Sequence, residues 1–562
     1  PFSNKGPSAI GRAGVDVVAN GAYAPGDEAL NYYVVSMWDT QPNGNLSWNS
    51  WGGTSRSCPV AAGVLALAYG AANSMQTPLL GEKAKALLLS SCTDLNYDVF
   101  SQGAGSVNAG QLMRTFRNEG AFAALLHPVP EQENYIITNR WEPGGYRGEK
   151  YPAFAHVIEP GQTDSAPVGV YATYPFDETL LAVARDVELK LIDQQEFPFV
   201  VTPEMVQGEF AFGEENRDNF FKAFQYMIPL TAVPGKDPSW YNIDVPEDTD
   251  LMVVRMLYPF EQYDADGDYT YDNRYSLMVY NWTDINGNGK VWEDLNNNGT
   301  VNFINRQRGE DAPDWDLIDG GMDLAWDDPR TELDQYEFAR FSYHRPGSNR
   351  LEMWVSNPLE RMADGLFIGL RHTPTNRYDG PTNFRVRVEF YSEQDCPWLR
   401  LESQVASTPD LEPNEVWATL SNTLPFNSFT AHAEPPADMN PGIYQAAIKI
   451  KAPMLEEESY HTIVIPVAMT VVHPTSMVGA TEWTLGGYET YTDAYNSGRL
   501  YNNACVRGQY DWTWREESGD WRFFYQDFAS VSPTSEGPTE YMIVRDQWSA
   551  PAPYNDIDTV IL

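Results

Sequence analysis

The feature that most constrains the fold is a change of hydrophobic pattern near residue 119. Before it, residues 55–72 and 81–91 place apolar side chains at helical spacing, and residues 15–19 have the character of a short buried strand. After it, short strand-like segments such as 188–192, 251–256 and 384–390 are separated by Pro, Gly, Asn and Asp. The sequence therefore predicts a multidomain chain, with an α/β domain over 1–118 followed by all-β sandwich domains.

The predicted β region divides at two further points. The turn-forming stretch 393–397 suggests a boundary near residue 395, and a linker begins at His473. We expect a large sandwich of jelly-roll type over 119–395 and a fibronectin-like or immunoglobulin-like sandwich over 396–475. The last domain, 476–562, is rich in aromatic residues, and we expect it to be incomplete at its C-terminal end.

The charge balance excludes two classes of partner. The chain carries 37 Lys and Arg against 78 Asp and Glu, a net charge of −41. No basic patch stands out, which argues against nucleic acid as the main partner and against docking on an anionic membrane. Such an acidic surface is soluble and can hold divalent cations, although a halophilic protein has the same composition.

The four cysteines are too few and too scattered to form a disulfide framework. Cys58 and Cys92 lie in apolar, helix-like stretches, so we expect both to be buried thiols. A disulfide between these two remains an open alternative at this stage.

One short stretch, residues 53–59, contains the candidate catalytic residue. Gly53 and Thr54 lead into a predicted helix that begins near Ser55, and Pro59 falls in its first turn, where a missing N–H is harmless. A serine at a helix start has an exposed hydroxyl and unpaired N–H groups beside it, which suit a nucleophile and half an oxyanion hole. The alternative is that Ser55 only caps the helix, and on this stretch alone capping is the more frequent role.

This stretch resembles the nucleophile motif of the subtilisin-like serine proteases, the subtilases. Two further regions resemble family segments in the same order: residues 2–7 followed by 14–21, and residues 102–109. The resemblance implies a subtilisin-like α/β fold, with Ser55 as catalytic nucleophile, Gly53, Thr54 and Pro59 as supporting motif residues, and peptides or proteins as substrates. The long β extension resembles the pyrolysin and tripeptidyl-peptidase II branch.

The chain departs from the family pattern in ways that bear on activity. Arg56 and Ser57 follow the serine where the family usually has Met and Ala, and Val60 stands where His is frequent. Asn20 replaces a usual Pro. Asp16 could be mistaken for the triad acid, but the resemblance makes it structural.

Residues 1–118 contain no histidine, and all seven histidines lie in the predicted β region. A serine nucleophile needs a base and an orienting carboxylate. The resemblance implies that the catalytic Asp, His and oxyanion Asn belong to an upstream part of the catalytic domain. The chain begins without Met and ends in an apolar run, so we expect it to be part of something longer.

A second constellation predicts structural calcium sites. Oxygen-bearing side chains recur at alternate positions before Gly289 and again before Gly299, as at the start of a calcium-binding loop, although Leu295 stands where an EF-hand needs an acidic residue. The alternative is a pair of polar Asn-Gly turns. The candidate ligands are Asp284, Asn286, Asn288, Lys290, Glu293, Asp294, Asn296 and Asn298, with Asp264, Asp266 and Asp268 as a weaker third group.

The sequence thus predicts a secreted or surface-attached subtilisin-like serine endopeptidase. The second hypothesis is a catalytically inactive, subtilase-derived structural or binding protein of an extracellular assembly, which Arg56 and the absent histidine favour. A third, supported only by the aromatic residues of 476–562, is an array of carbohydrate-binding sandwiches.

Overall fold

The structure is a computed structural model of the 562-residue chain. It describes residues 3, 5–6, 15–21, 24–27, 48–51, 53–76, 79, 81–125, 156–158, 160–203, 209–211, 228–229, 243–266, 271–282, 300–302, 338–344, 349–361, 365–372, 378–423, 425–439, 442–456 and 458–471. The predicted domain over 476–562 lies outside these ranges. No helix in the described part is long and apolar enough to cross a membrane.

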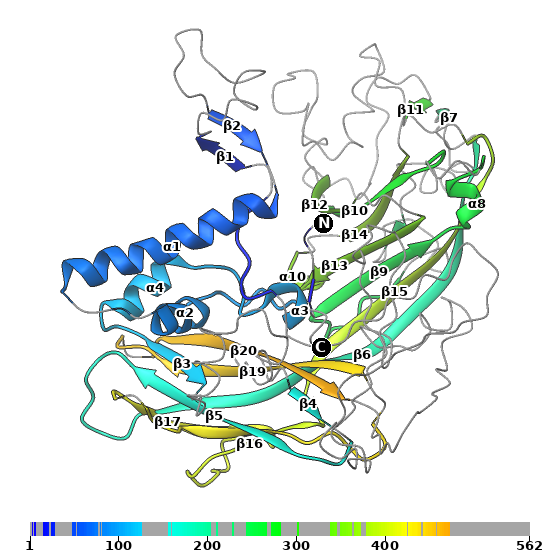
Figure 1. The fold of residues 1–562 in the computed structure, drawn as a ribbon. Helices are drawn as coiled ribbons and strands as arrows, with labels where there is room; N and C mark the ends of the chain where they lie inside the picture. Colours follow the sequence, from blue (N-terminus) through cyan, green and yellow to red (C-terminus); the bar gives the residue numbers. More distant parts are fainter. Residues whose placement is uncertain are drawn as a thin grey trace, which may run out of the picture. The chain divides into compact units, whose positions relative to one another are not determined.

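The described chain is rich in strands (Figure 1). It forms two compact units. One consists mainly of Leu189–Glu393. The other joins Ser3–Glu188 to Gln394–Thr513, so it contains both the predicted α/β segment and the strands that follow residue 394.

The two predicted helices are present in the first part of the chain as α1 (Thr54–Ser74) and α2 (Gly81–Ser90). Two shorter helices follow them, α3 (Val99–Gln102) and α4 (Ala109–Phe116). The side chains of Asp98 and Asn108 cap the N-termini of α3 and α4. Asp98 accepts a hydrogen bond from Ser101 N, and Asn108 accepts one from Gln111 N.

In the same unit, the strands form two layers around an apolar core. One layer contains β3 (Ala121–Leu125), β5 (Asp164–Ala172), β18 (Phe429–Ala433) and β16 (Leu399–Glu402), paired antiparallel in that order. The other contains β6 (Leu181–Val201), β19 (Gly442–Pro453) and β20 (Tyr460–Val471), with β4 (His156–Ile158) parallel to β20. β17 (Glu415–Ser421) pairs with both β5 and β6.

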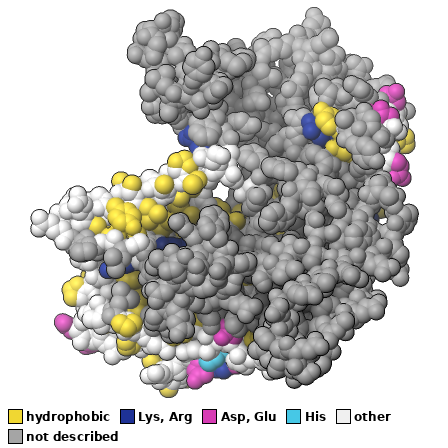
Figure 2. Space-filling model, in the orientation of Figure 1, with side chains coloured by type: hydrophobic (Ala, Val, Ile, Leu, Met, Phe, Trp, Pro, Cys, Tyr) yellow, Lys and Arg dark blue, Asp and Glu magenta, His cyan; other side chains and the backbone are white. Residues whose placement is uncertain are grey.

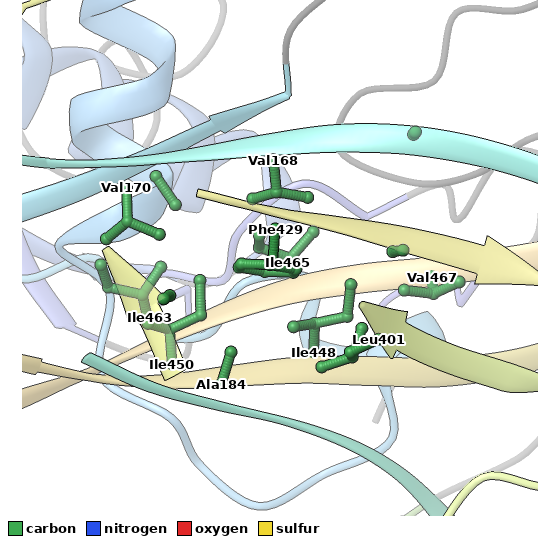
Figure 3. Packing of buried hydrophobic residues seen from close by; sticks show 14 of the residues in the cluster. Val168, Val170, Ala184, Leu401, Phe429, Ile448, Ile450, Ile463, Ile465 and Val467 are labelled. Atoms are coloured by element: carbon green, nitrogen blue, oxygen red, sulfur yellow. The ribbon is translucent and has the colours of Figure 1, made fainter. Parts of the chain in front are cut away.

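Alternation along the strands sends apolar side chains into this core. Val168 and Val170 of β5 face Ile448 and Ile450 of β19, and all four are fully buried (Figure 3). The opposite face of β19 and β20 packs against α2 and α3. The unit is therefore layered, with the helices on the outer side of the sheet that contains β19 and β20 (Figure 1).

The unit of Leu189–Glu393 contains a sheet of β9 (Leu251–Leu257), β13 (Arg350–Ser356) and β15 (Thr382–Gln394), in which β9 lies between the other two. The long strand β6 continues into this unit and neighbours β15. The remaining elements are β7 (Glu209–Ala211), β8 (Ile228–Pro229), α8 (Phe260–Tyr263), β10 (Tyr275–Trp282), β11 (Thr300–Asn302), β12 (Phe338–His344), α10 (Pro358–Arg361) and β14 (Gly365–His372). A separate hairpin joins β1 (Ala24–Asp27) to β2 (Trp48–Trp51).

The prediction that Cys58 and Cys92 are both buried is correct for Cys92 and wrong for Cys58. Cys92 is buried, and burial raises the pKa of its thiol to about 12. Cys58, by contrast, is exposed on α1, and both thiols are free. An apolar helical pattern predicts burial only where another element covers that face of the helix.

Candidate active site

The serine motif lies at the N-terminus of the longest helix of the described chain. Gly53 is the N-cap of α1, with φ 149° and no side-chain cap, and it accepts hydrogen bonds from the N–H groups of Arg56 and Ser57. The helix begins at Thr54, so Ser55 occupies its second position with an exposed side chain. Ser55 is therefore not the capping residue, and its hydroxyl is accessible where the helix dipole favours negative charge.

The segment 15–21 supports this helix start. Gly53 N donates to Gly21 O over 2.6 Å, and Ser57 Oγ donates to Ala19 O over 3.0 Å. A Cβ atom on Gly21 would overlap the Ser57 hydroxyl. Ser57, a departure from the family pattern in the sequence, thus helps to join two of the motif segments.

The segment 102–109 supports residues 15–21 from the other side. Ala104 N donates to Asp16 O, Val18 N donates to Gly105 O and Val107 N donates to Val18 O, each over 2.9 Å. Gly103 has φ 61° and approaches the Asp16 carbonyl so closely that a Cβ atom would clash with it. Residues 15–21 therefore connect the segment 102–109 to the start of α1 through hydrogen bonds.

The family comparison covers this region. Residues 1–106 match the model of the subtilase family. The match includes the serine motif and the segment 15–21, and it ends inside the segment 102–109. It supports a serine protease of subtilase type. No curated protein matches the chain.

The described side chains do not provide a subtilase triad around Ser55. Asp16 makes an ion pair with Lys85, with Asp16 Oδ2 3.5 Å from Lys85 Nζ. This contact agrees with the structural role expected for Asp16.

Three histidines are described with their side chains, and each has another partner. His461 Nε2 lies 2.8 Å from Ser90 O, and His432 Nε2 lies 3.3 Å from a Glu402 oxygen. His372 packs against the Tyr275 ring, and burial lowers the pKa of its imidazole to about 4. Among these described side chains, none is a hydrogen-bond partner of Ser55.

The helix that carries Ser55 has apolar side chains that the described residues leave largely uncovered. Only Val64, Ala68 and Ala72 of its 21 residues are buried. Leu67 is 51% exposed and Tyr69 is 44% exposed. Figure 2 shows that hydrophobic side chains gather on the surface over α1. The other exposed residues of the helix are Thr54, Ser55, Cys58, Pro59, Val60, Ala62, Gly63, Ala66, Gly70, Asn73 and Ser74.

The predicted calcium loops are only partly described. The candidates between Asp284 and Asn298, and also Asp268, lie outside the described residues. Asp264 and Asp266 come together with Asp272, and one carboxylate oxygen from each lies within 4.8 Å of the others. Sequence reasoning missed Asp272, although an Asp four residues beyond Asp268 continues the acidic run.

Asp272 also has a local structural role. Its Oδ2 accepts hydrogen bonds from Ala265 N over 2.8 Å and from Asp266 N over 3.2 Å, which closes the turn that follows α8. The three carboxylates could supply oxygen ligands to a hard cation such as Ca²⁺. Calcium binding stays a prediction.

Proposed function

We propose that this chain belongs to a subtilisin-like serine endopeptidase in which Ser55 is the nucleophile. The observation that supports this most strongly is the hydrogen-bonded connection of three motif segments, in which residues 15–21 join the segment 102–109 to the start of α1. At that helix start the Ser55 side chain is exposed beside the N–H groups of Thr54 and Ser55. These amides precede the first intrahelical hydrogen bonds, so they can donate to a developing oxyanion.

The reaction would proceed in two steps. Ser55 Oγ attacks the carbonyl carbon of the scissile peptide bond, its proton passes to a base, and the base then protonates the leaving amine. Water, deprotonated by the same base, attacks the acyl-enzyme and releases the carboxylic acid, while Ser55 recovers its proton. Arg56 is half-buried next to the nucleophile, where its charge would favour acidic side chains in the substrate.

The base must come from outside residues 1–118, which contain no histidine. We propose that an upstream part of the catalytic domain supplies the Asp, the His and the oxyanion Asn, and that it packs on the uncovered face of α1. On the exposed surface of α1, the large side chains of Leu67 and Tyr69 are accompanied by small residues, which suit close packing of another element. These small residues are Ala62, Gly63, Ala66 and Gly70.

The β domains would position or anchor the enzyme outside the cell, in the manner of the pyrolysin and tripeptidyl-peptidase II branch. We propose that calcium stiffens the Asp- and Asn-rich loops there. If so, the thermal midpoint of the protein should be higher in Ca²⁺ than in the chelator EGTA, because an ion that binds only the folded state stabilises it. Equal midpoints at millimolar Ca²⁺ would remove calcium from the proposal.

Fluorophosphonate labelling of the natively purified protein tests the nucleophile. The expected result is a single adduct, located on Ser55 by peptide mass spectrometry and absent from Ser55→Ala. Because the probe requires an assembled base and oxyanion hole, peptides from the upstream segment should be present in the same sample. A folded protein that includes this segment and still gives no adduct would contradict the proposal.

That negative result would favour the second candidate, a subtilase-derived scaffold without activity. Two observations support it: Arg56 adjoins the serine, and residues 1–118 have no histidine. An upstream segment that lacks a catalytic histidine would also favour the scaffold over the enzyme.

A further inference from the structure

A buried ion pair joins residues 1–118, called the subtilase-like segment from here on, to the two strand layers made of β3–β6 and β16–β20, called the sandwich. Lys449 of β19 places Nζ 2.6 Å from Asp94 Oδ2 and 3.4 Å from Asn96 Oδ1. The two charged side chains are only 8% and 12% exposed. A buried ion pair contributes strongly to local geometry, because the loss of one partner leaves the other charge without compensation.

Asp94 organises the loop between α2 and α3. Its Oδ1 accepts hydrogen bonds from Asn96 N and from Gln102 Nε2, each over 2.9 Å. Gln102 is itself buried and accepts a hydrogen bond from Leu95 N over 2.9 Å. Burial alone would raise the pKa of the Asp94 carboxyl, but the charge and hydrogen bond of Lys449, together with the hydrogen bonds from Asn96 and Gln102, hold the pKa below its ordinary value.

The Asp94 loop is continuous with the segment that supports the helix start. Gly105 N donates to Gln102 O over 3.0 Å, and Thr93 exchanges two backbone hydrogen bonds of 2.8 Å with Ser106. Gly105 has φ 117°, and a Cβ atom there would overlap the Thr93 carbonyl. The backbone around Asp94 therefore packs directly against the segment 102–109.

From there the contacts already described lead to Ser55. The segment 102–109 holds residues 15–21 through Asp16 and Val18, and residues 15–21 hold Gly53 and Ser57. Each step is a hydrogen bond or a backbone contact, so the network is physically contiguous from β19 to the N-terminus of α1.

We propose that Lys449 is a positioning residue for Ser55. By fixing Asp94, it keeps the segment 102–109 in place against residues 15–21, and thereby keeps the N-cap of α1 in a reactive geometry. The sandwich would thus be part of the catalytic apparatus. This inference rests on the proposed function, because a residue can position Ser55 for catalysis only if Ser55 reacts.

The experiment compares four forms of the natively purified protein: wild type, Lys449→Met, Lys449→Arg and Lys451→Met. Lys451 is a matched control, because it lies two residues along the same strand on the same face but is exposed. Its side chain contacts only the ring of Tyr460 among the described interactions, at 4.6 Å. The rate constant and the reversible binding constant of fluorophosphonate modification are measured for each form.

We expect Lys449→Met to lower the modification rate constant about tenfold while the binding constant and the final labelled fraction stay unchanged. Lys449→Arg should recover most of the rate because it retains the charge, and Lys451→Met should match the wild type. A lower labelled fraction with an unchanged rate constant would indicate loss of folded protein, and it would overturn the proposal. So would a Lys449→Met rate equal to the wild-type rate.

Hydrogen exchange separates failure of this inference from failure of the proposed function. In Lys449→Met, the amides of Val18, Ala104 and Val107 should lose protection, whereas Lys451→Met should leave them protected. If the wild type takes up no probe, the proposed function fails, and the exchange result alone then decides whether Lys449 holds the start of α1. Unchanged exchange at these three amides would overturn the inference in either case.

Discussion

The helices α1 and α2 are both rich in Ala and Leu, yet they differ sharply in how much of their surface is covered. Every residue from Ala86 to Ser90 of α2 is buried, whereas α1 buries only three of 21 residues. The difference comes from their neighbours, because α2 packs on β3 and β20 while the face of α1 that contains Leu67 and Tyr69 has no such cover among the described residues. An apolar helix is buried only where another element reaches it.

The cover of α2 and α4 includes specific polar contacts as well as apolar burial. His461 Nε2 lies 2.8 Å from Ser90 O, and Leu455 N donates to Glu119 O over 3.1 Å. The turn between β19 and β20 thereby contacts the end of α4, where Arg114 pairs with Glu456. The sandwich thus completes one side of the subtilase-like segment.

The largest expected effect is on thiol reactivity. In the chain alone, Cys58 should react with a maleimide at the rate of an accessible thiol, and Cys92 at least about a thousandfold more slowly, since Cys92 is exposed only when the structure opens. Rates are measured by peptide-resolved mass spectrometry. Addition of the upstream segment should slow the reaction of Cys58 with the maleimide. Similar reaction rates for Cys58 and Cys92 would show that α1 and α2 do not differ in how far they are covered.

A second test compares the loss of stability when a buried leucine of α4 and an exposed leucine of α1 are each replaced by alanine. Leu112 of α4 is fully buried, so Leu112→Ala should lower the free energy of unfolding by about 2–5 kcal/mol, as do other core truncations. Leu67→Ala, on the exposed face of α1, should change it by no more than about 0.5 kcal/mol. Urea unfolding measures both variants, and a large loss for Leu67→Ala would mean that α1 is covered in the chain alone.

A smaller effect concerns the stability of the covering sandwich as a function of pH. Burial, reinforced by the charge of Asp395, raises the pKa of Asp186 to about 6. Because this folded-state pKa lies above the ordinary value, the contribution of Asp186 is fully present below about pH 4 and is lost as the pH rises through 6. We expect a decline of about 1–2 kcal/mol over that interval, after a discount for partial solvation.

Asp186→Asn is the matched variant for that measurement. Its amide oxygen can still accept the hydrogen bond from Cys396 N, which the carboxylate now accepts over 3.1 Å. Urea unfolding at pH 4, 5 and 6 should show a flatter profile for the variant than for the wild type. If the free energy of unfolding changes with pH in the same way in both proteins, titratable groups other than Asp186 cause the decline.

The smallest expected effect is at the surface contact between α4 and the turn after β19. Arg114 Nη2 lies 3.2 Å from Glu456 Oε2, but Glu456 is largely exposed. Glu456→Gln should therefore lower the free energy of unfolding by less than about 0.5 kcal/mol. A loss as large as that of Leu112→Ala would show that charge, rather than apolar burial, holds the helices on the sandwich.

Local patterns in the sequence account for much of the fold. Apolar residues at helical spacing predicted α1 and α2, and alternation predicted strands at 188–192, 251–256 and 384–390, all of which lie in strands of the structure. The match to the subtilase family supports the resemblance drawn from the serine motif. Both signals arise within short windows of the chain.

Contacts between distant segments of the chain could not be predicted from the sequence. Lys449 alternates with Ile448 and Ile450, a pattern that predicts a solvated lysine, yet it is buried against a loop 353 residues away at Asn96. Cys58 shows the reverse error, since its apolar surroundings predict burial without specifying a partner. The roles of Ser55 and of the calcium ligands, and the domain boundaries, stay predictions.

The packing of α2 and α3 on β19 and β20 has a consequence during protein synthesis. The covering strands begin at Gly442, more than 300 residues after α4 ends at Phe116. At about 5–20 residues per second, a ribosome needs about 15–60 s to supply them. Leu87, Leu88 and Leu112 can pack on Phe122 and Tyr171 soon after they are made, but the side of α2 that contacts β20 stays uncovered throughout that interval. The subtilase-like segment should therefore be a substrate for holding chaperones until the chain reaches Val471.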